Sequence, residues 1–318
     1  MFYAHLKMTL KEKQDTLQKS IDQLNMMQND PTMQHQDIEK LKREIEKEKQ
    51  DIYSHLSAYD RLYLARRQDR PHLRDYINQL FDDFIEMHGD RYFGDDQAIV
   101  GGIAYFENQP VTIIGHQKGH NLDDNMQCRF GMASPEGYRK AIRLMKQAEK
   151  FHRPIITFVD TPGAYPAKEA EENNVGEAIG QCLLALSDIK TPVIAIVIGE
   201  GGSGGALALS VGDHLAMLEN AVYSVLSPEG FASILWKDKS GERVAEACEV
   251  MKMTAYDLLD FHIIDEIIPE AQGGANQDPL VSYKAIKAML EEQLSVLKKM
   301  AIKDLLRKRY EKLRVIGK

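Results

Sequence analysis

Residues 199–208 read GEGGSGGALA, and this glycine-rich stretch constrains the fold more than any other part of the chain. It directly follows an apolar run, VIAIVI at residues 193–198, of the kind that forms a buried parallel strand. Glycines let the backbone turn tightly and approach a ligand closely. The small residues that follow predict a helix, and the first N–H groups of a helix have no partner within it. The stretch therefore predicts a strand, a tight turn and a helix start that can hold an anion.

Two nucleotide-binding interpretations of this stretch fit the letters to different degrees. Gly199, Gly201 and Gly204 spell the dinucleotide fingerprint G-x-G-x-x-G after a strand, and Glu219 follows at a tolerable distance for a ribose contact. A phosphate-binding P-loop fits less well, because no lysine follows the last glycine. The dinucleotide interpretation therefore stays open on these letters.

Two catalytic interpretations compete with it. Ser203 is the middle residue of G-x-S-x-G, the nucleophile elbow of serine hydrolases, and His214 and His262 follow as candidate bases. The other interpretation is an oxyanion hole without a nucleophile, in which glycine N–H groups hold a developing negative charge. These two and the dinucleotide site carry equal weight here, so the rest of the chain must separate them.

The composition is that of an ordinary globular protein. With 318 residues, 43% of them hydrophobic, the chain is long enough for one large α/β domain or two smaller ones. Its net charge of −8 argues against nucleic acid as the main partner. No run is apolar enough to cross a bilayer and no signal peptide is evident, so we expect a cytoplasmic protein with no membrane contact. The three cysteines form no C-x-x-C pair, and we expect no metal in this chain.

Helical periodicity marks both ends of the chain. Apolar residues recur every three or four positions in residues 10–24 and again in residues 38–59, which predicts two helices in a hairpin. A long helix is predicted near the C-terminus. The expected domains are an N-terminal helical hairpin at residues 1–65, a central domain at residues 66–275 and a C-terminal helical extension at residues 276–318.

The central domain repeats one order of elements, which is strand, glycine turn and helix. Residues 155–159 predict a buried strand, and a rigid Pro-Gly turn (DTPG at residues 160–163) follows it. A helix at about residues 170–186 then leads to the strand before the glycine-rich stretch. In such a crossover arrangement the two strand ends are neighbours, and their loops form one site. An earlier helix is predicted at residues 76–84.

Five longer motifs follow one another along the central domain. They are GHQKG at 115–119, FGM at 130–132 with PEGYRKA at 135–141, DTPGAYP at 160–166, the glycine-rich stretch, and YSV at 223–225 with SPEG at 227–230. In this order the motifs resemble the alpha subunit of the carboxyltransferase component of bacterial acetyl-CoA carboxylase. The resemblance implies a crotonase-like α/β fold (the ClpP/crotonase class), a spiral of ββα units, in place of a Rossmann or hydrolase sheet.

The resemblance also implies a reaction and its partners. A carboxyl group moves from N-carboxybiotin, held on a separate biotin carboxyl carrier protein, to acetyl-CoA and gives malonyl-CoA for fatty acid synthesis. The biotin itself takes part in the reaction, since its ureido oxygen takes up negative charge and its nitrogen takes the acetyl proton. The protein positions the reactants and stabilises oxyanions. The implied partners are a beta subunit with a zinc ribbon, in an alpha2-beta2 assembly, and biotin carboxylase.

The resemblance assigns the site to backbone groups. Gly204 and Gly205 would hold the ureido oxygen of biotin, and Gly163 and Ala164 would form the facing wall of the site. The other candidate substrate-binding residues are Gly201, Gly202, His116 and Lys118.

Some positions depart from the family's pattern. Arg129 stands where the family has asparagine, and Ala167 stands where it has glycine. Residues 171–175 read EENNV in place of an E-E-R-G-Q stretch. These differences add a further hypothesis beside the serine hydrolase with Ser203 as nucleophile, namely a non-catalytic paralogue that only docks the biotin carrier.

Overall fold

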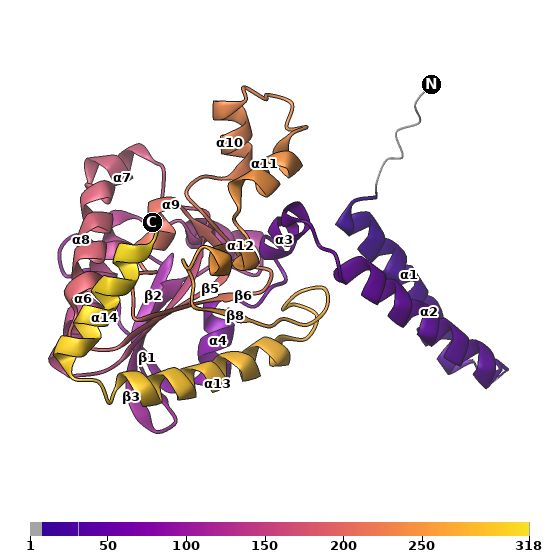
Figure 1. The fold of residues 1–318 in the computed structure, drawn as a ribbon, viewed down its shortest axis with the longest axis horizontal. Helices are drawn as coiled ribbons and strands as arrows, with labels where there is room; N and C mark the ends of the chain where they lie inside the picture. Colours follow the sequence, from indigo (N-terminus) through magenta and orange to yellow (C-terminus); the bar gives the residue numbers. More distant parts are fainter. Residues whose placement is uncertain (1–7, 31, 318) are drawn as a thin grey trace.

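Strand β5 (Val193–Gly202), which runs into the glycine-rich turn, lies inside the sheet that forms the core (Figure 1). In the computed structural model, which describes residues 8–30 and 32–317, the sheet has eight strands in the order β1-β2-β3-β4-β5-β6-β8, and β7 pairs with β5. β1, β2 and β3 pair antiparallel, and the later strands pair in parallel. The other strands are β1 (Asp82–Glu86), β2 (Ile99–Phe106), β3 (Gln109–His116), β4 (Ile155–Thr161), β6 (His214–Leu218), β7 (Val222–Ser224) and β8 (Glu266–Ile268).

The sheet is covered by helices on both faces. A Cβ atom on Gly101 would meet Leu144 of α6, and one on Gly115 would meet Leu73 of α4. Gly101 pairs with Ile114, and successive residues of a strand face opposite sides, so α6 and α4 lie on opposite faces. All seven residues of β4 are buried, as expected for a parallel strand covered on both sides.

The helices of the body continue these two layers. α6 packs on α8, which in turn contacts α14, and α4 packs on α13. None of the described helices is both long and apolar enough to pass through a bilayer. The helices are α1 (Leu10–Asn29), α2 (His35–Tyr53), α3 (Ala58–Ala65), α4 (Leu73–Leu80), α5 (Leu122–Gln127), the 3-10 turn η1 (Arg129–Gly131), α6 (Pro135–Lys150), α7 (Lys168–Glu172), α8 (Val175–Asp188), α9 (Ser203–Leu207), α10 (Pro228–Leu235), α11 (Val244–Met251), α12 (Ala255–Asp260), α13 (Pro279–Leu297) and α14 (Ile302–Val315).

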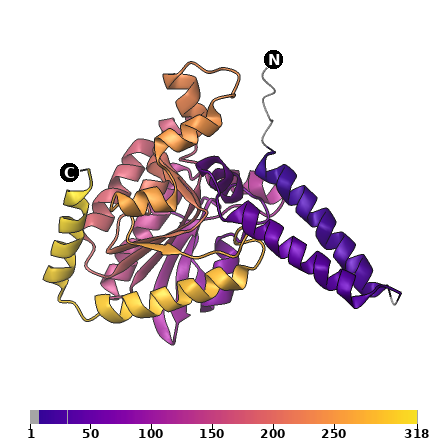
Figure 2. The same cartoon turned by 45° about the vertical axis from the view of Figure 1, so that its right-hand side comes forward.

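The N-terminal hairpin consists of α1 and α2, which pack side by side and project from the body (Figure 2). The first seven residues of the predicted hairpin lie outside the described residues. α1 begins at a capping box, in which the Thr9 side chain accepts the N–H of Glu12. The apolar stripes meet in a small cluster of their own, formed by Leu10, Leu17, Ile45, Ile52 and Leu64.

Two predicted helices differ from those in the structure. The helix predicted at residues 76–84 ends at Leu80, and Asp82–Glu86 form strand β1 beside β2. Phe81 packs against Phe106 of β2, so pairing with the sheet edge prevails over helical spacing.

The predicted long C-terminal helix is two helices, α13 and α14. The guanidinium of Arg309 in α14 is buried and binds both carboxylate oxygens of Asp213 at 2.9 and 2.7 Å. It also donates to the carbonyl oxygen of Leu186, in the last turn of α8, and to that of Ile189 just after the helix. A straight helix would continue away from these groups, so the chain turns at residues 298–301 to reach them.

Candidate active site

The carboxyl ends of β4 and β5 lie next to each other, as the order of strands and turns predicts. The two strands pair in parallel up to Thr161 and Gly201, with one irregularity just before that pair. The turn after β4 therefore meets the turn and short helix after β5. This edge of the sheet holds Gly204 and Gly205, the predicted catalytic residues, and Gly163 and Ala164, the predicted facing wall.

The two turns approach so closely that two positions require glycine. A Cβ atom on Gly202 would collide with the carbonyl oxygen of Pro162. One on Gly205 would lie 2.7 Å from the amide nitrogen of Ala164, which is closer than real Cβ contacts come. Backbone thus packs closely on backbone here, and the Tyr138 hydroxyl lies beside this contact, 2.9 Å from the position of the same Cβ.

Helix α9 begins in the middle of the glycine-rich stretch. Ser203 has a left-handed backbone with φ of 54°, and Gly202 caps the helix without any side chain. The first-turn N–H groups of such a helix have no partner within it. Gly204 is half-buried and Gly205 is buried. These N–H groups are the kind of donor from which oxyanion holes are built.

A network of charges with a largely buried centre lies behind the glycine-rich turn. The Lys118 ammonium is 2.8 Å from Oδ1 of Asp160 and 3.2 Å from Oε1 of Glu200. Glu200 also accepts from Nε of Arg66 at 2.7 Å, and Arg66 donates to Glu229 at 2.6 Å. The network ties the ends of β3, β4 and β5 to the residue that follows α3.

Asp160 and Lys118, at the centre of this network, stay charged although they are largely buried. Burial raises the pKa of the Asp160 carboxyl, but the Lys118 ammonium and His72 outweigh this effect and hold the pKa well below its usual range. Burial lowers the pKa of Lys118, and the two carboxylates more than restore it. The N–H of Glu200 donates to Oδ1 of Asp160 at 3.0 Å. Asp160 therefore anchors the backbone at the start of the glycine-rich turn.

His116 is fully buried at the end of β3, close to the backbone of Gly205. Burial lowers the pKa of its imidazole to about 4, against the opposing effect of the Asp160 carboxylate, so the ring is neutral at pH 7. Neither ring nitrogen has a hydrogen-bond partner among the described residues. His116 and Lys118 thus lie behind the turn, and their substrate-binding roles stay predictions.

The histidines of the hydrolase interpretation lie at the other edge of the sheet from Ser203. His214 pairs with Ile194 near the start of β5, whereas Ser203 follows the end of that strand. At about 3.3 Å per residue, the two positions are roughly 25–30 Å apart. His262 precedes β8, which is parallel to β6, and so lies at the same edge as His214. Neither histidine can serve Ser203 as a base.

Glu219, the acidic residue that the dinucleotide interpretation needs for a ribose contact, is already paired with other side chains. The Glu219 carboxylate, at the end of β6, accepts from the Tyr256 hydroxyl at 2.8 Å and lies 3.9 Å from Nη1 of Arg61. In addition, the antiparallel β2 and β3 at one side of the sheet are foreign to the parallel order of a Rossmann domain. The oxyanion-hole interpretation is the one that this geometry supports.

The residues that depart from the family's pattern hold the loop after β4 against the start of α6. Arg129 donates to Oδ1 of Asp96 at 2.8 Å, and its guanidinium lies over the ring of Tyr165. Asp96 in turn accepts from the backbone and hydroxyl of the residue that precedes α6. At the end of α7, the carbonyl oxygen of Asn173 accepts from Arg139.

Three residues at this edge have no role in the motif reasoning: Arg66, Asp160 and Tyr138. Asp160 could have been predicted, because a polar residue at the carboxyl end of a buried strand is typical of a ligand-binding edge. Arg66 and Tyr138 carry no such signal. Arg66 meets Glu200 across 134 positions of sequence, and Tyr138 has the spacing of an ordinary core residue of a helix.

A cavity of about 440 Å³ adjoins the charge network. Its lining includes Arg66, His72, Lys118, Phe130, Asp160 and Glu200. Across residues 8–30 and 32–317, no cluster of three or more His, Cys, Asp or Glu side chains has the arrangement of a metal site.

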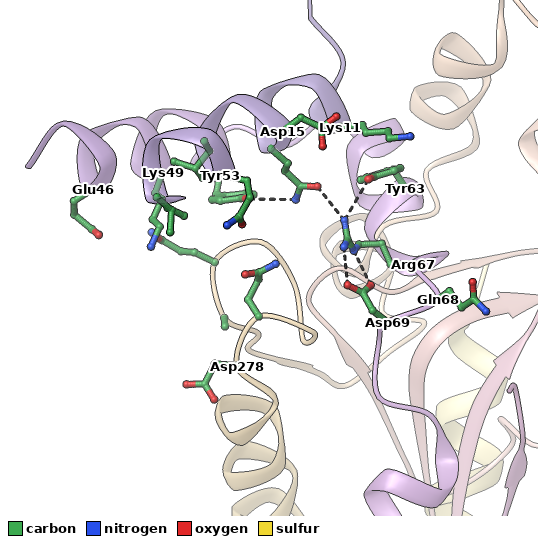
Figure 3. Close-up of a pocket in the computed structure, with 17 residues that line it drawn as sticks. Lys11, Asp15, Glu46, Lys49, Tyr53, Tyr63, Arg67, Gln68, Asp69 and Asp278 are labelled. Atoms are coloured by element: carbon green, nitrogen blue, oxygen red, sulfur yellow. Dashed lines mark hydrogen bonds and ion pairs between the residues drawn. The ribbon is translucent and has the colours of Figure 1, made fainter. Parts of the chain in front are cut away.

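A larger groove of about 810 Å³ separates the hairpin from the body (Figure 3). Polar hydrogen bonds bridge it. Arg67 donates to the Tyr63 hydroxyl and to Oε1 of Gln14, each at 3.2 Å, and the amide of Gln14 donates to the Tyr53 hydroxyl. Asp69 binds the other side of the Arg67 guanidinium. These bonds attach the hairpin to the rest of the chain.

The chain matches a family model described as acetyl co-enzyme A carboxylase carboxyltransferase-like over residues 8–317. It is 54% identical over 281 residues to the acetyl-coenzyme A carboxylase carboxyl transferase subunit alpha of Halalkalibacterium halodurans, covering 88% of this chain and 86% of that protein. It is 50% identical over 308 residues to the protein of the same name from Staphylococcus carnosus, covering 97% and 95%.

Solved structures share the fold at lower identity. A transcarboxylase 12S chain superimposes with a TM-score of 0.58 at 21% identity, covering 73% of this chain and 44% of that one. The beta subunit of a P. aeruginosa geranyl-CoA carboxylase gives a TM-score of 0.56 at 15% identity, covering 80% and 45%. The chain thus spans less than half the length of these two neighbours. The likeness confirms the predicted crotonase-like α/β fold.

Proposed function

The chain belongs to the family of acetyl-CoA carboxylase carboxyltransferase alpha subunits, and on this premise we propose that it transfers the carboxyl group of carboxybiotin to acetyl-CoA and so forms malonyl-CoA. This is the first step of fatty acid synthesis. Carboxybiotin arrives as a substrate on a separate carrier protein. The observation that supports this most is the close approach of Gly205 to the turn at Gly163 and Ala164, which places backbone N–H groups at one strand edge.

The proposed catalytic groups are the backbone N–H groups of Gly204 and Gly205, which bind the ureido oxygen of biotin. Gly163 and Ala164 form the facing wall. A ureido group is neutral when it binds and gains negative charge as the carboxyl group leaves, so fixed donors stabilise the charged state more than the neutral one. A side chain at Gly205 would push the two turns apart and displace these donors, since its Cβ would lie 2.7 Å from the Ala164 nitrogen.

The remaining candidate residues hold this arrangement in place. Gly202 permits the close approach of the turns, since its Cβ would collide with the turn after β4, and Gly201 leaves room for the ring of Tyr223 on β7. Lys118 and His116 support the turn from behind. Because the Lys118 ammonium is already paired with two carboxylates, we assign charge stabilisation to the backbone donors.

We also propose the partners and the setting. The relatives are named as subunit alpha, which supports action with a beta subunit in an alpha2-beta2 assembly, together with biotin carboxylase and the carrier protein. Zinc and the hole for the acetyl thioester are assigned to the beta subunit, and the location to the cytoplasm. Leu207 and Val225 flank the glycine-rich turn and are 42% and 85% exposed, which suits a face that a partner covers.

The test is reconstitution. The purified chain is mixed with a matching beta subunit, assembly is checked by size-exclusion chromatography, and malonyl-CoA formed from acetyl-CoA and carboxybiotin is measured by mass spectrometry. We expect malonyl-CoA in proportion to the assembled complex. An assembled complex that forms none contradicts the proposal.

The same preparation separates the alternatives. Ser203→Gly removes the hydroxyl and relieves the left-handed φ of 54°. A serine hydrolase loses all activity with this change, whereas an oxyanion-hole enzyme keeps most of it, because the backbone N–H remains. A non-catalytic docking paralogue binds the biotinylated carrier protein and forms no malonyl-CoA.

A further inference from the structure

Tyr138 brings to this edge a chemical group that has no assigned use. Its side chain is fully buried on α6, and its hydroxyl has no hydrogen-bond partner among the described residues. A buried hydroxyl without a partner is destabilising, and a phenylalanine would fill the same space without it. Tyr76 shares this property, so the case for a role of Tyr138 rests on the groups that lie next to its hydroxyl.

The hydroxyl lies next to the backbone of Gly205, which is part of the proposed oxyanion hole. A Cβ atom on Gly205 would be 2.9 Å from Oη of Tyr138, and the same atom would be 2.7 Å from the Ala164 nitrogen and the Gly163 carbonyl carbon. The hydroxyl, the peptide between Gly163 and Ala164, and the backbone of Gly205 therefore border one small space. That space lies between the two turns.

Three hydrogen bonds fix the start of α6 and so hold Tyr138 in place. The backbone and hydroxyl of Ser134, just before α6, donate to Oδ2 of Asp96 at 2.7 and 2.9 Å and fix the start of the helix. The N–H of Tyr165 donates to the carbonyl oxygen of Ala133 at 3.0 Å and ties the turn after β4 to the same helix start. The hydroxyl and the turn are thus parts of one rigid unit, which is what preorganised stabilisation of charge requires.

The hydroxyl also stays protonated. Burial raises the pKa of Tyr138 well above its usual value, and the Cys182 thiol and the Asp96 carboxylate act in the same direction. At neutral pH the group is therefore a neutral O–H dipole.

We propose that Tyr138 is a positioning residue of the carboxyltransferase site, an inference that rests on the function proposed above. Its hydroxyl sets the spacing between Gly205 and the turn at Gly163 and Ala164, and it adds a fixed dipole beside the N–H groups that face the ureido oxygen. The influence passes through the backbone, because the hydroxyl itself is shielded from solvent. Tyr138 therefore acts on the charged state of the reaction and leaves acetyl-CoA binding alone.

The test compares Tyr138→Phe with Tyr76→Phe in the assembled alpha–beta complex. Tyr76 is the matched control, because it is also fully buried with an unpaired hydroxyl but packs against Phe158 and Tyr283. For Tyr138→Phe we expect kcat to fall about tenfold, less than the ~10²–10³-fold loss of a direct oxyanion donor. KM for acetyl-CoA and the melting temperature should stay unchanged. Tyr76→Phe should keep the kcat of the natural chain.

A second measurement does not depend on turnover. The complex is labelled with 3-fluorotyrosine, the Tyr138 resonance is identified by its loss in Tyr138→Phe, and free biotin is titrated. We expect the Tyr138 resonance to shift and the Tyr76 resonance to stay in place. An active natural complex with equal kcat in Tyr138→Phe overturns the inference, as do equal losses in both variants or an unshifted resonance. A natural complex that forms no malonyl-CoA overturns the proposed function instead, and the titration still decides the role of Tyr138.

Discussion

At the carboxyl ends of β4 and β5 the backbone leaves no room for a side chain at Gly202 or Gly205, whereas in the N-terminal hairpin most side chains of α1 and α2 face solvent. The strand edge is fixed from several sides at once, by backbone contact at Gly202 and Gly205 and by the buried pairs of Lys118. The hairpin relies on one apolar stripe, a capping box and a few polar bonds such as those of Arg67 (Figure 3).

The difference teaches which changes each region tolerates. Where several contacts fix the same backbone atoms, the loss of any one of them disturbs the others, and effects on stability and activity are large and coupled. Where each contact acts locally, a change frays one element and leaves the rest intact. The reacting edge needs the first kind of construction, because fixed donors must not move as charge develops.

The largest effect is expected from Gly205→Val. The new Cβ would lie 2.7 Å from the Ala164 nitrogen and force the two turns apart, so we expect kcat to fall by at least about 10²–10³-fold. Malonyl-CoA formation by the assembled complex measures this. Gly204→Ala is the control for folding, since its Cβ would make only ordinary contact with Ile179 at 3.6 Å, and its melting temperature should stay near that of the natural chain. Full activity in Gly205→Val would contradict the site.

The buried charges give the next largest effect. Lys118→Met leaves Asp160 and Glu200 facing each other without their shared cation, and we expect a loss of about 3–5 kcal/mol in the free energy of unfolding. Urea denaturation at pH 7 measures it. Lys42→Met in the hairpin removes an exposed partner of Glu39 and should change nothing measurable. Equal losses in the two variants would remove the contrast between the regions.

Lowering the pH should destabilise the strand edge, where His116 is buried, by a smaller amount. The buried His116 has a pKa of about 4 in the folded chain and about 6.5 when unfolded, so the unfolded state binds more protons between these values. Stability is therefore complete above about pH 6.5 and falls by up to about 3 kcal/mol as the pH drops to 4. Denaturation curves between pH 7 and 4.5 measure this slope. His116→Gln should flatten it, and an unchanged slope in that variant would refute the assignment.

The smallest effect is expected in the hairpin. Thr9→Ala removes the side-chain acceptor at the start of α1 and should weaken that helix locally by about 1 kcal/mol. Hydrogen exchange of the first turns of α1 should speed up, while kcat of the assembled complex stays unchanged. A fall in kcat would show that the hairpin takes part in the reaction.

Local patterns were enough to predict much of this arrangement. Apolar runs and the glycine turns after them predicted that β4 and β5 are neighbours, and the pairing of Thr161 with Gly201 confirms it. Periodicity predicted the hairpin helices, because an apolar stripe needs only its own spacing to be recognised. The same reasoning was wrong at residues 82–86, since the spacing of Phe81 and Phe84 suits a helix, and pairing with the open edge of β2 prevails over it.

By itself, the sequence determined the order of the elements, the glycines that must turn and, through its motifs, the family. Those properties depend on residues that are near each other in the chain. Only the tertiary structure decided that Arg66, Lys118 and Glu200 form one charge network, and that the Tyr138 hydroxyl lies next to Gly205. These groups come from separate helices and strand ends. Their meeting depends on the register of the sheet and the seating of α6, and no local pattern of residues encodes either.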